Sequence, residues 1–536
     1  MNLAEKVAQM VVVRASGNLF DNQIRYPDWE PPTNKLKYWL QDLGVGGVIF
    51  VDGSAIDLAT RIQQLQSWAK TPLLLAADIE EGVGQRFAGA TWFPPPMAIA
   101  AIAQTNPKKA IEYAEIMGTI TAQEAVAIGL NWVLAPVVDV NNNPGNPVIN
   151  IRAFGETTEL VGQLATAFIR GTQKYPVLTT AKHFPGHGDT TVDSHFELPV
   201  LPHSESRLAE IELPPFVEAI AAGVDSVMSA HLLIPAWDSE LPATLSHKIV
   251  TGQLRQKLGF NGLVVTDALV MGAIANRYGL EEASVLAVEA GADILLMPLD
   301  PEVTINAVCN AVSQGRISES RIDESLQRIE QVKTKVYPTW QPGNEEGSEN
   351  FSAPTYHLVD KLERPQAQET VTQILDDSLE VGGSYIPPQP SVKHLRNLVF
   401  VDDILNSTFL GNHTPAVALP KQFGYQLQII DSNSELPEAL TPNNLTLLQL
   451  FIRGSAFSQI ASLTQASQDL IKKLLINGEL QGLIIYGSQY TLKQFSCEML
   501  SDIPYVFCYG QMPKAQAIAL KLFFKNLQIY KYFSKI

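Results

Sequence analysis

The chain has 536 residues, and 46% of them are apolar. This length is greater than that of a typical domain with a single hydrophobic core. Its net charge of −17, from 38 basic and 55 acidic residues, argues against general affinity for nucleic acid or anionic membranes, because both attract basic surfaces. With no secretory signal pattern, no apolar run of membrane-spanning length and three cysteines without CxxC spacing, the sequence predicts a two-domain protein of the cytoplasm.

Eight short apolar runs, most of them alternating with helical segments, occupy the first 300 residues, as expected of parallel β/α units. The predicted strands are Met10–Val13, Gly47–Val51, Leu73–Ala77, Trp132–Val138, Val177–Ala181, Ser226–Ser229, Leu263–Thr266 and Ile294–Met297. Polar groups follow at least five of these strands at the same end, whereas a doubly wound sheet would concentrate them near one switch point. The sequence therefore predicts a (β/α)8 TIM-type barrel with its functional site at the carboxyl-terminal face.

The densest group of titratable residues follows the fifth predicted strand, where Ala181–Gly188 precedes the triplet Asp193-Ser194-His195. Proline and glycines exclude a helix here, so we expect Lys182 and His183 at the carboxyl end of the strand. A zinc site on His183 and His187 is disfavoured, because Phe-Pro-Gly between them prevents a shared helical face. We expect a catalytic loop and no metal.

A single carboxylate, Asp267, ends the β-branched run before a turn and is a candidate nucleophile. The alternative interpretation is a helix-capping or turn aspartate. Asp78, Lys182 and His183 supply charged and hydrogen-bonding groups suited to a polyhydroxylated ligand such as a sugar. Retaining glycoside hydrolysis needs a nucleophile and a separate proton donor, and Asp267 can fill only the first role.

The barrel is predicted to span residues 1–336, ending in a capped helix that starts near Gly315–Asp323 and runs to Val336. A linker rich in Pro, Gly, Ser and Asn is predicted over 337–366, and a smaller α/β layered C-terminal domain over 367–536. We expect strands and a helix in that domain, and we expect its last stretch, Lys521–Ile536, to be a docked helix. The expected elements are Asn397–Val401, Leu427–Ile430, Leu445–Phe451, Leu483–Tyr486 and Tyr505–Cys508 as strands, and Ala466–Leu475 as a helix.

Two other enzyme classes are disfavoured by the sequence. Gly44-Val45-Gly46-Gly47 precedes a strand instead of joining a strand to a helix, so it does not support a dinucleotide cofactor. A G-x-S-x-G elbow is absent, which argues against a serine hydrolase of the α/β type. We expect no organic cofactor.

Several motifs together resemble the glycoside hydrolase family 3 β-N-acetylglucosaminidases, especially the branch that recycles peptidoglycan fragments. They include the loop described above and Thr266-Asp267. The remaining motifs are Asp78-Ile79-Glu80-Glu81-Gly82 with Gln85-Arg86-Phe87, Phe93-Pro94-Pro95-Pro96-Met97-Ala98, Ala135-Pro136-Val137-Val138-Asp139-Val140, and Asn146-Pro147-Val148-Ile149 with Arg152-Ala153-Phe154-Gly155. The chain departs from the family pattern at Glu81 and Val83, where a glycine and an arginine are usual.

The resemblance implies roles for particular residues. Asp267 would be the nucleophile that forms a glycosyl-enzyme, and His195, paired with Asp193, would be the acid/base. An imidazole titrates near neutrality, so one group can donate and then accept a proton. His187 and His231 would position the loop and the nucleophile. The residues that would hold the sugar hydroxyls are Asp78, Arg86, Arg152, Lys182 and His183.

The sequence thus predicts an exo-acting, retaining β-N-acetylglucosaminidase. Its expected substrate is an N-acetylglucosamine-containing oligosaccharide or muropeptide, such as an anhydro-muropeptide of the cell wall. Three alternatives stay open: a phosphorylase with the same residues, a family 3 β-glucosidase, and a non-catalytic sugar-binding protein.

Overall fold

The computed structural model describes residues 1–341, 357–383, 394–401, 403–404, 407–431, 444–453, 465–495, 500–501 and 503–526. The chain forms two compact units. The first contains Met1–Pro96, Asn106–Asn143 and Arg152–Gln368, and the second contains Met97–Thr105, Pro144–Ile151 and Glu369–Ile536. Half of the predicted linker, residues 342–356, lies outside the described residues, as do Cys497 and residues 527–536, so the linker stays a prediction.

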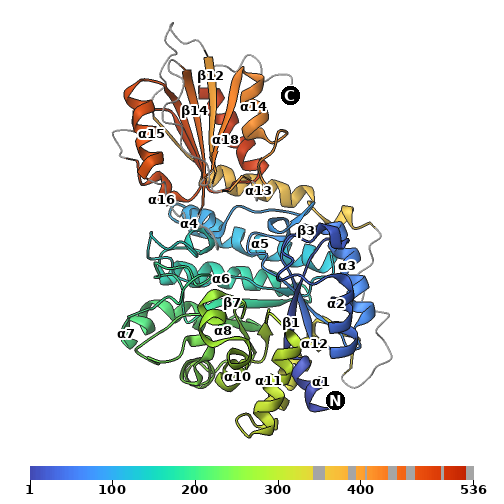
Figure 1. Cartoon of the computed structure of the whole chain (residues 1–536). Helices are drawn as coiled ribbons and strands as arrows, with labels where there is room; N and C mark the ends of the chain where they lie inside the picture. Colours follow the sequence, from blue (N-terminus) through green and yellow to red (C-terminus); the bar gives the residue numbers. More distant parts are fainter. Residues whose placement is uncertain are drawn as a thin grey trace. The chain divides into compact units, whose positions relative to one another are not determined.

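The first unit is built on an eight-stranded parallel sheet in the order β10-β1-β2-β4-β6-β7-β8-β9. Figure 1 labels two of these strands, β1 and β7, together with helices of the same unit such as α5, α6 and α8. A bridge between Val265 and Ile294 joins β9 to β10, so the sheet nearly closes into a barrel. The predicted barrel and its eight strands are confirmed. The strands are β1 (Val11–Ala15), β2 (Gly47–Phe50), β4 (Leu74–Ala77), β6 (Trp132–Val133), β7 (Leu178–Phe184), β8 (Ser226–Ser229), β9 (Leu263–Thr266) and β10 (Leu295–Leu296).

Two strands differ from the prediction by three or more residues at their carboxyl ends. β6 ends at Val133, because Pro136 lacks the N–H that a continuing ladder needs, and Val137 pairs again only through a bridge to Lys182. β7 instead continues to Phe184, with a shift in its register against β8 between Lys182 and Phe184. Lys182 and His183 therefore lie at the carboxyl end of β7, as predicted.

Helices cover the barrel, and their sequences show why they form. In α12 (Glu319–Val336), the hydroxyl of Ser318 accepts a hydrogen bond from the Arg321 N–H. Buried residues recur every three or four positions along it, at Ile322, Leu326, Ile329, Lys333 and Val336. This confirms the predicted helix. The other helices of this unit are α1 (Leu3–Ala8), α2 (Thr33–Tyr38), α3 (Ala55–Trp68), α5 (Pro107–Ala127), α6 (Thr158–Thr172), α7 (Glu205–Arg207), α8 (Pro214–Ala221), α9 (Gly272–Tyr278), α10 (Leu280–Ala290) and α11 (Pro301–Ser313).

Irregular turns and a small sheet complete the first unit. The π-helical segments η2 (Trp39–Leu43), η5 (Leu208–Glu212) and η7 (Lys248–Lys257) extend the helical layer, and β3 (Gly53–Ser54) pairs with β5 (Phe87–Ala88). The short 3-10 turns are η1 (Asp21–Gln23), η3 (Val83–Gln85), η6 (Ala243–Leu245) and η9 (Val359–Lys361), and η4 (Asn150–Arg152) begins in the second unit and ends in the first.

The second unit is built on a six-stranded sheet in the order β11-β16-β15-β14-β12-β13. The five predicted strands are present, and the edge strand β11 (Glu380–Gly382), which is antiparallel to β16, was not predicted because three residues give no periodicity. The other strands are β12 (His394–Val401), β13 (Tyr425–Asp431), β14 (Asn444–Ile452), β15 (Leu480–Gly487) and β16 (Tyr505–Cys508). The helices are α4 (Pro96–Ala103), α13 (Pro365–Ser378), α14 (Pro415–Gln422), α15 (Gln465–Ile476), α16 (Gln489–Leu492) and α18 (Pro513–Asn526).

The helix predicted at Ala466–Leu475 lies within α15, and α18 covers the described part of the predicted terminal helix. Among the described residues, no helix combines the length and the apolar composition needed to cross a membrane.

Candidate active site

The carboxyl ends of the barrel strands carry the polar residues of the first unit. Asp78 follows β4, Lys182 and His183 end β7, and Asp267 follows β9. Parallel strands in a barrel end on one face, so these residues share that face although they are far apart in sequence.

Asp267 has the properties of an ionised nucleophile. Its Oδ1 accepts a hydrogen bond from the Ala268 N–H at 2.7 Å. Burial raises the pKa of this carboxyl, but His231, His183, His195 and the Ala268 N–H together outweigh burial and bring the pKa to about 2. The carboxylate is therefore charged at neutral pH, and its side chain is only partly covered.

His231 holds the turn that carries Asp267. Its side chain is fully buried, its Nε2 donates to the carbonyl oxygen of Ala268 at 3.0 Å, and its Nδ1 lies 2.9 Å from Thr244 Oγ1. Burial lowers the pKa of the imidazole. His231 thus contacts the residue that follows the candidate nucleophile, and Thr244 is a partner that the sequence did not reveal.

The predicted His195–Asp193 pair is present in the loop after β7. Asp193 Oδ1 accepts from both the ring Nδ1 of His195, at 2.6 Å, and its backbone N–H, at 2.8 Å. With Nδ1 held in this way, the proton that His195 can exchange is the one on Nε2. The Gly272 N–H donates to the His195 carbonyl oxygen at 3.1 Å, so this loop contacts the segment that follows Asp267.

His187 anchors the same loop. Its ring nitrogens lie 2.8 Å from Thr190 Oγ1 and 3.1 Å from Ser194 Oγ, and its backbone N–H donates to Asp139 Oδ1 at 2.7 Å. Burial, with repulsion from His183, lowers the pKa of His187 to about 4, so the imidazole is neutral at pH 7. His187 therefore ties the residue before His195 to the end of the barrel.

A second polar cluster surrounds Lys182, whose side chain is 1% exposed. Its Nζ lies 2.7 Å from Asp78 Oδ1 and 2.7 Å from Glu80 Oε1. Arg152 donates from Nε and Nη2 to the two oxygens of Glu80, both at 2.8 Å. Burial raises the pKa of Glu80, yet Arg152 and Lys182 hold it well below its usual range. Glu80 therefore fixes both cations.

Two predicted sugar-binding residues remain, His183 and Arg86, and each contacts a residue already described. Asp139 is fully buried and accepts from His183 twice, at its Nδ1 (2.8 Å) and its backbone N–H (3.1 Å). Arg86 donates from Nε to the carbonyl oxygen of Asp78 at 3.1 Å.

The structure links every predicted site residue to one of these groups by hydrogen bonds or charge interactions. It adds Glu80 and Asp139, which lie shortly after the predicted strands Leu73–Ala77 and Trp132–Val138 and had no predicted role. The sequence feature that could have identified them is a carboxylate within three residues of the end of a predicted strand. Among the described residues, no group of three or more His, Cys, Asp or Glu side chains is arranged to hold a metal ion.

Family models cover most of the chain. Residues 2–332 match the glycosyl hydrolase family 3 N terminal domain, and residues 389–525 match the bacterial glycosyl hydrolase family 3 C-terminal domain.

Relatives of known name agree with this match. The chain is 33% identical over 368 residues to β-hexosaminidase A of Pseudoalteromonas piscicida, covering 63% of this chain and 60% of that protein. It is 32% identical over 311 residues to a β-N-acetylglucosaminidase/β-glucosidase of Cellulomonas fimi, covering 56% of this chain and 54% of that protein. The chain thus spans less than two thirds of the length of these two relatives.

A solved structure matches nearly the whole chain. The glycoside hydrolase family 3 β-N-acetylglucosaminidase from Paenibacillus sp. str. FPU-7 is 30% identical with a TM-score of 0.76, over 98% of this chain and 97% of that one. With a family model matching more than half of the sequence, the chain belongs to glycoside hydrolase family 3.

Proposed function

We propose that this protein is an exo-acting, retaining β-N-acetylglucosaminidase that removes N-acetylglucosamine from the non-reducing end of its substrate. The observation that carries the proposal is the ionised, partly exposed Asp267 beside the hydrogen-bonded His195–Asp193 pair. The printed names of the relatives, a β-hexosaminidase and β-N-acetylglucosaminidases, support the same activity.

In the first step, a carboxylate oxygen of Asp267 attacks the anomeric carbon while His195 Nε2 gives its proton to the leaving oxygen. The glycosidic C–O bond breaks, and a glycosyl ester forms on Asp267. Asp193 stabilises the imidazole as it exchanges its proton, because the carboxylate already accepts from Nδ1.

In the second step, neutral His195 takes a proton from water, whose oxygen attacks the anomeric carbon as the ester bond to Asp267 breaks. Two inversions at the same carbon give net retention. At the end of the cycle, His195 is again protonated at Nε2 and Asp267 is again a free carboxylate, as both were before the first step.

The cluster around Lys182 is proposed to hold the sugar hydroxyls. Asp78 is the accessible member, with a side chain 32% exposed, whereas Lys182 is buried and orients it. Arg152, 13% exposed, presents a guanidinium fixed in two hydrogen bonds to Glu80. The family resemblance extends the proposal to cell-wall fragments such as anhydro-muropeptides as the natural substrate.

A phosphorylase is the second candidate, and the His195 acid/base favours it. An imidazole repels an incoming phosphate less than a second carboxylate does, so phosphate can replace water in the second step.

The test is the initial rate of 4-nitrophenol release from 4-nitrophenyl N-acetyl-β-glucosaminide and from the matching β-glucoside, with and without phosphate. We expect release from the first substrate, reduced about 1,000-fold or more by Asp267→Asn. The matched control is Asp300→Asn, which changes the carboxylate that caps α11.

Each other result points elsewhere. Sugar phosphate among the products would identify the phosphorylase, and preference for the glucoside would identify a β-glucosidase. If the wild-type protein released 4-nitrophenol from neither substrate, the result would favour a sugar-binding protein. Full activity of Asp267→Asn would eliminate Asp267 as the nucleophile.

A further inference from the structure

The loop between β4 and α4, residues 78–95, carries two of the predicted sugar-binding residues, Asp78 and Arg86. The side chain of Asp78 is held by Lys182, whose Nζ lies 2.7 Å from Oδ1. The side chain of Arg86 makes one hydrogen bond among the described residues, from Nε to the Asp78 carbonyl oxygen at 3.1 Å. The position of Arg86 therefore depends on the backbone turn that carries it.

That turn packs against the second half of the same loop. The Arg86 N–H donates to the Val83 carbonyl oxygen at 3.2 Å, and the Gly84 N–H donates to the Thr91 carbonyl oxygen at 2.8 Å. A Cβ atom added at Gly82 would lie 2.6 Å from the same Thr91 oxygen, so the two backbone segments are in direct contact. A displacement of Thr91 therefore displaces the turn that leads into Arg86.

Thr91 is held by Glu124 of α5. The Thr91 N–H donates to Oε2 of this glutamate at 2.8 Å, and the Thr91 hydroxyl donates to Oε1 at 2.7 Å. Both residues are buried. A third segment reaches the same carboxylate, because the Glu363 N–H donates to Oε1 at 2.8 Å. Glu124 thus joins the loop that carries Arg86, the helix α5 and the chain that follows the last helix of the barrel.

The segment around Glu363 is itself fixed on the first unit. The φ angle of Glu363 is 45°, in the left-handed region that residues with a side chain rarely adopt. Leu358 and Leu362, which flank η9 just before it, are buried. Packing of this segment therefore holds the N–H that Glu124 receives, and the carboxylate is fixed by donors from two parts of the chain.

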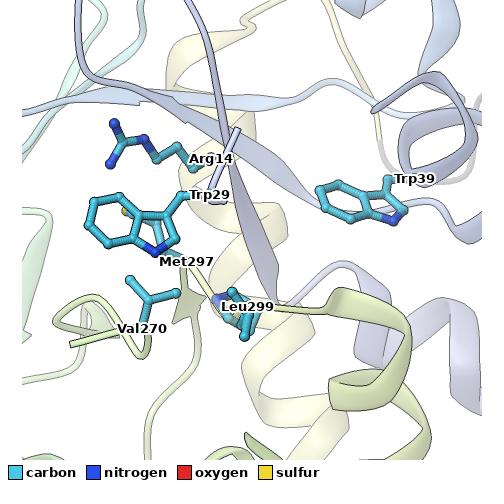
Figure 2. Close-up of a pocket in the computed structure, with 7 residues that line it drawn as sticks. Arg14, Trp29, Trp39, Val270, Met297 and Leu299 are labelled. Atoms are coloured by element: carbon cyan, nitrogen blue, oxygen red, sulfur yellow. The ribbon is translucent and has the colours of Figure 1, made fainter. Parts of the chain in front are cut away.

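Glu124 differs in its partners from Glu30, another buried glutamate of the first unit. Glu30 pairs with Arg14 at 2.9 Å, and that arginine lines a small pocket together with Trp29 and Val270 (Figure 2). Among the described residues, the donors to Glu124 are two backbone N–H groups and a hydroxyl, all of them neutral. Burial raises the pKa of Glu124, since no cation offsets the loss of water. An amide at this position would therefore leave no buried cation unpaired.

We propose that Glu124 is a positioning residue for sugar binding, which acts through Thr91 to hold Arg86 against the terminal N-acetylglucosamine. The inference rests on the proposed function and adds a residue to the same site. All three donors need a carboxylate, because both of its oxygens accept, whereas an amide has one accepting oxygen and an NH2 group. In Glu124→Gln, this NH2 group faces either the Thr91 N–H or the Glu363 N–H, and one of the two hydrogen bonds is lost.

The test measures the inhibition constant Ki of N-acetylglucosamine against hydrolysis of 4-nitrophenyl N-acetyl-β-glucosaminide. We expect Glu124→Gln to raise Ki about tenfold, the size of one hydrogen bond to a charged group. In an Arg86→Ala background, the same change should alter Ki less than about twofold, because the side chain that Glu124 positions is already absent. A loss of folded protein alone would lower the rate without changing Ki, since Ki does not depend on the amount of active enzyme.

Two further variants keep the test decisive. Thr91→Val keeps the backbone N–H and the shape of the side chain but removes the hydroxyl donor, and we expect it to raise Ki even if Glu124→Gln does not fold. Glu112→Gln makes the same change at an exposed glutamate of α5, and we expect the wild-type Ki from it.

The results that overturn the inference are distinct from failure of the proposed function. A wild-type Ki in both Glu124→Gln and Thr91→Val, with normal hydrolysis by the wild-type protein, would overturn the inference alone. The same rise in Ki with and without Arg86 would show that Glu124 acts on the site by another route, which also overturns it. Absence of wild-type hydrolysis of 4-nitrophenyl N-acetyl-β-glucosaminide would overturn both proposals.

Discussion

At the residue scale, His195 and Asp193 are held together because one carboxylate oxygen of Asp193 accepts hydrogen bonds from both the ring Nδ1 and the backbone N–H of His195. This arrangement fixes the imidazole relative to its own backbone. A second His–Asp pair, between His203 Nε2 and Asp189 Oδ2 at 2.9 Å, is more exposed and has no assigned role in the reaction.

We expect His195→Ala to slow turnover of N-acetylglucosaminyl disaccharides by about 100- to 10,000-fold, the usual contribution of general acid catalysis. Aryl glycosides should lose much less in the glycosylation step, since a phenolate leaves without full protonation. Single-turnover rates on both substrates measure the difference, and His203→Ala is the matched control. Equal losses on both substrates would show that His195 is not the acid.

Lys333 is a buried cation that the proposed mechanism does not use. Its side chain is 1% exposed, and its Nζ donates to Gln9 Oε1 at 2.8 Å. Burial lowers its pKa from 10.5 to about 7. The unfolded chain therefore binds more protons than the folded chain between about pH 7 and 10.5, and stability rises with pH across that window.

We expect Lys333→Met to remove this rise, which has a maximum slope of about 1.4 kcal/mol per pH unit, and to stabilise the protein most below pH 7. Urea unfolding followed at several pH values measures the effect. The exposed Lys257→Met should leave the pH dependence unchanged. A wild-type stability that falls from pH 7 to 9, with the same fall in Lys333→Met, would contradict the assignment.

At the element scale, the amino ends of β9 and β10 are joined by the fully buried Asp293. Its carboxylate accepts from the Val264 N–H at 3.0 Å and from Ser325 Oγ at 2.8 Å, and it pairs with Arg255 and Arg328. One side chain thus links two strands, η7 and α12 at the seam where the barrel closes.

Replacing Asp293 with Asn should lower the free energy of unfolding by about 3–5 kcal/mol, because a fully buried carboxylate is removed and the partly buried arginines around it lose their counter-charge. Turnover per folded molecule should be retained, since Asp293 precedes β10 at the end of the barrel opposite Asp267. Denaturant titration and active-site-normalised rates check both statements. Asp323→Asn, at an exposed pair with Lys6, is the control expected to change little. A similar small loss in Asp293→Asn would refute the central role of this carboxylate.

At the scale of the whole molecule, the second unit includes chain from within the barrel sequence. Met97–Thr105 and Pro144–Ile151 group with Glu369–Ile536, and Ser488 Oγ donates to Asn150 Oδ1 at 2.9 Å within that unit. Arg152, a proposed sugar-binding residue, follows Ile151 directly in the chain.

We therefore expect deletion of residues 369–536 to lower both stability and activity. The buried residues Met97, Ile99 and Ile102 of α4 would lose the rest of their unit, which exposes apolar surface. Thermal unfolding and initial rates of the truncated chain measure the result, and Ser488→Ala gives the effect of a single lost hydrogen bond. A truncated chain with unchanged melting temperature and turnover would show that the C-terminal part is auxiliary.

Much of this arrangement was predictable from local patterns. The barrel strands form nearly continuous apolar runs because both faces of the sheet are buried, and Pro185 and Gly186 mark the loop after β7. The antiparallel edge strand β11 escaped prediction because it is short, and the end of β6 was misplaced because the apolar run continues past Pro136.

The sequence by itself determined the barrel, the positions of its eight strands and the pairing of the neighbouring residues Asp193 and His195, because these depend on local periodicity and on contacts within a few positions. Only the tertiary structure decided that Glu80 pairs with Arg152, 72 positions later, and that Arg14 lies across a pocket from Val270. Such contacts depend on strand register and barrel closure, which bring together side chains whose separation in sequence carries no signal of their proximity.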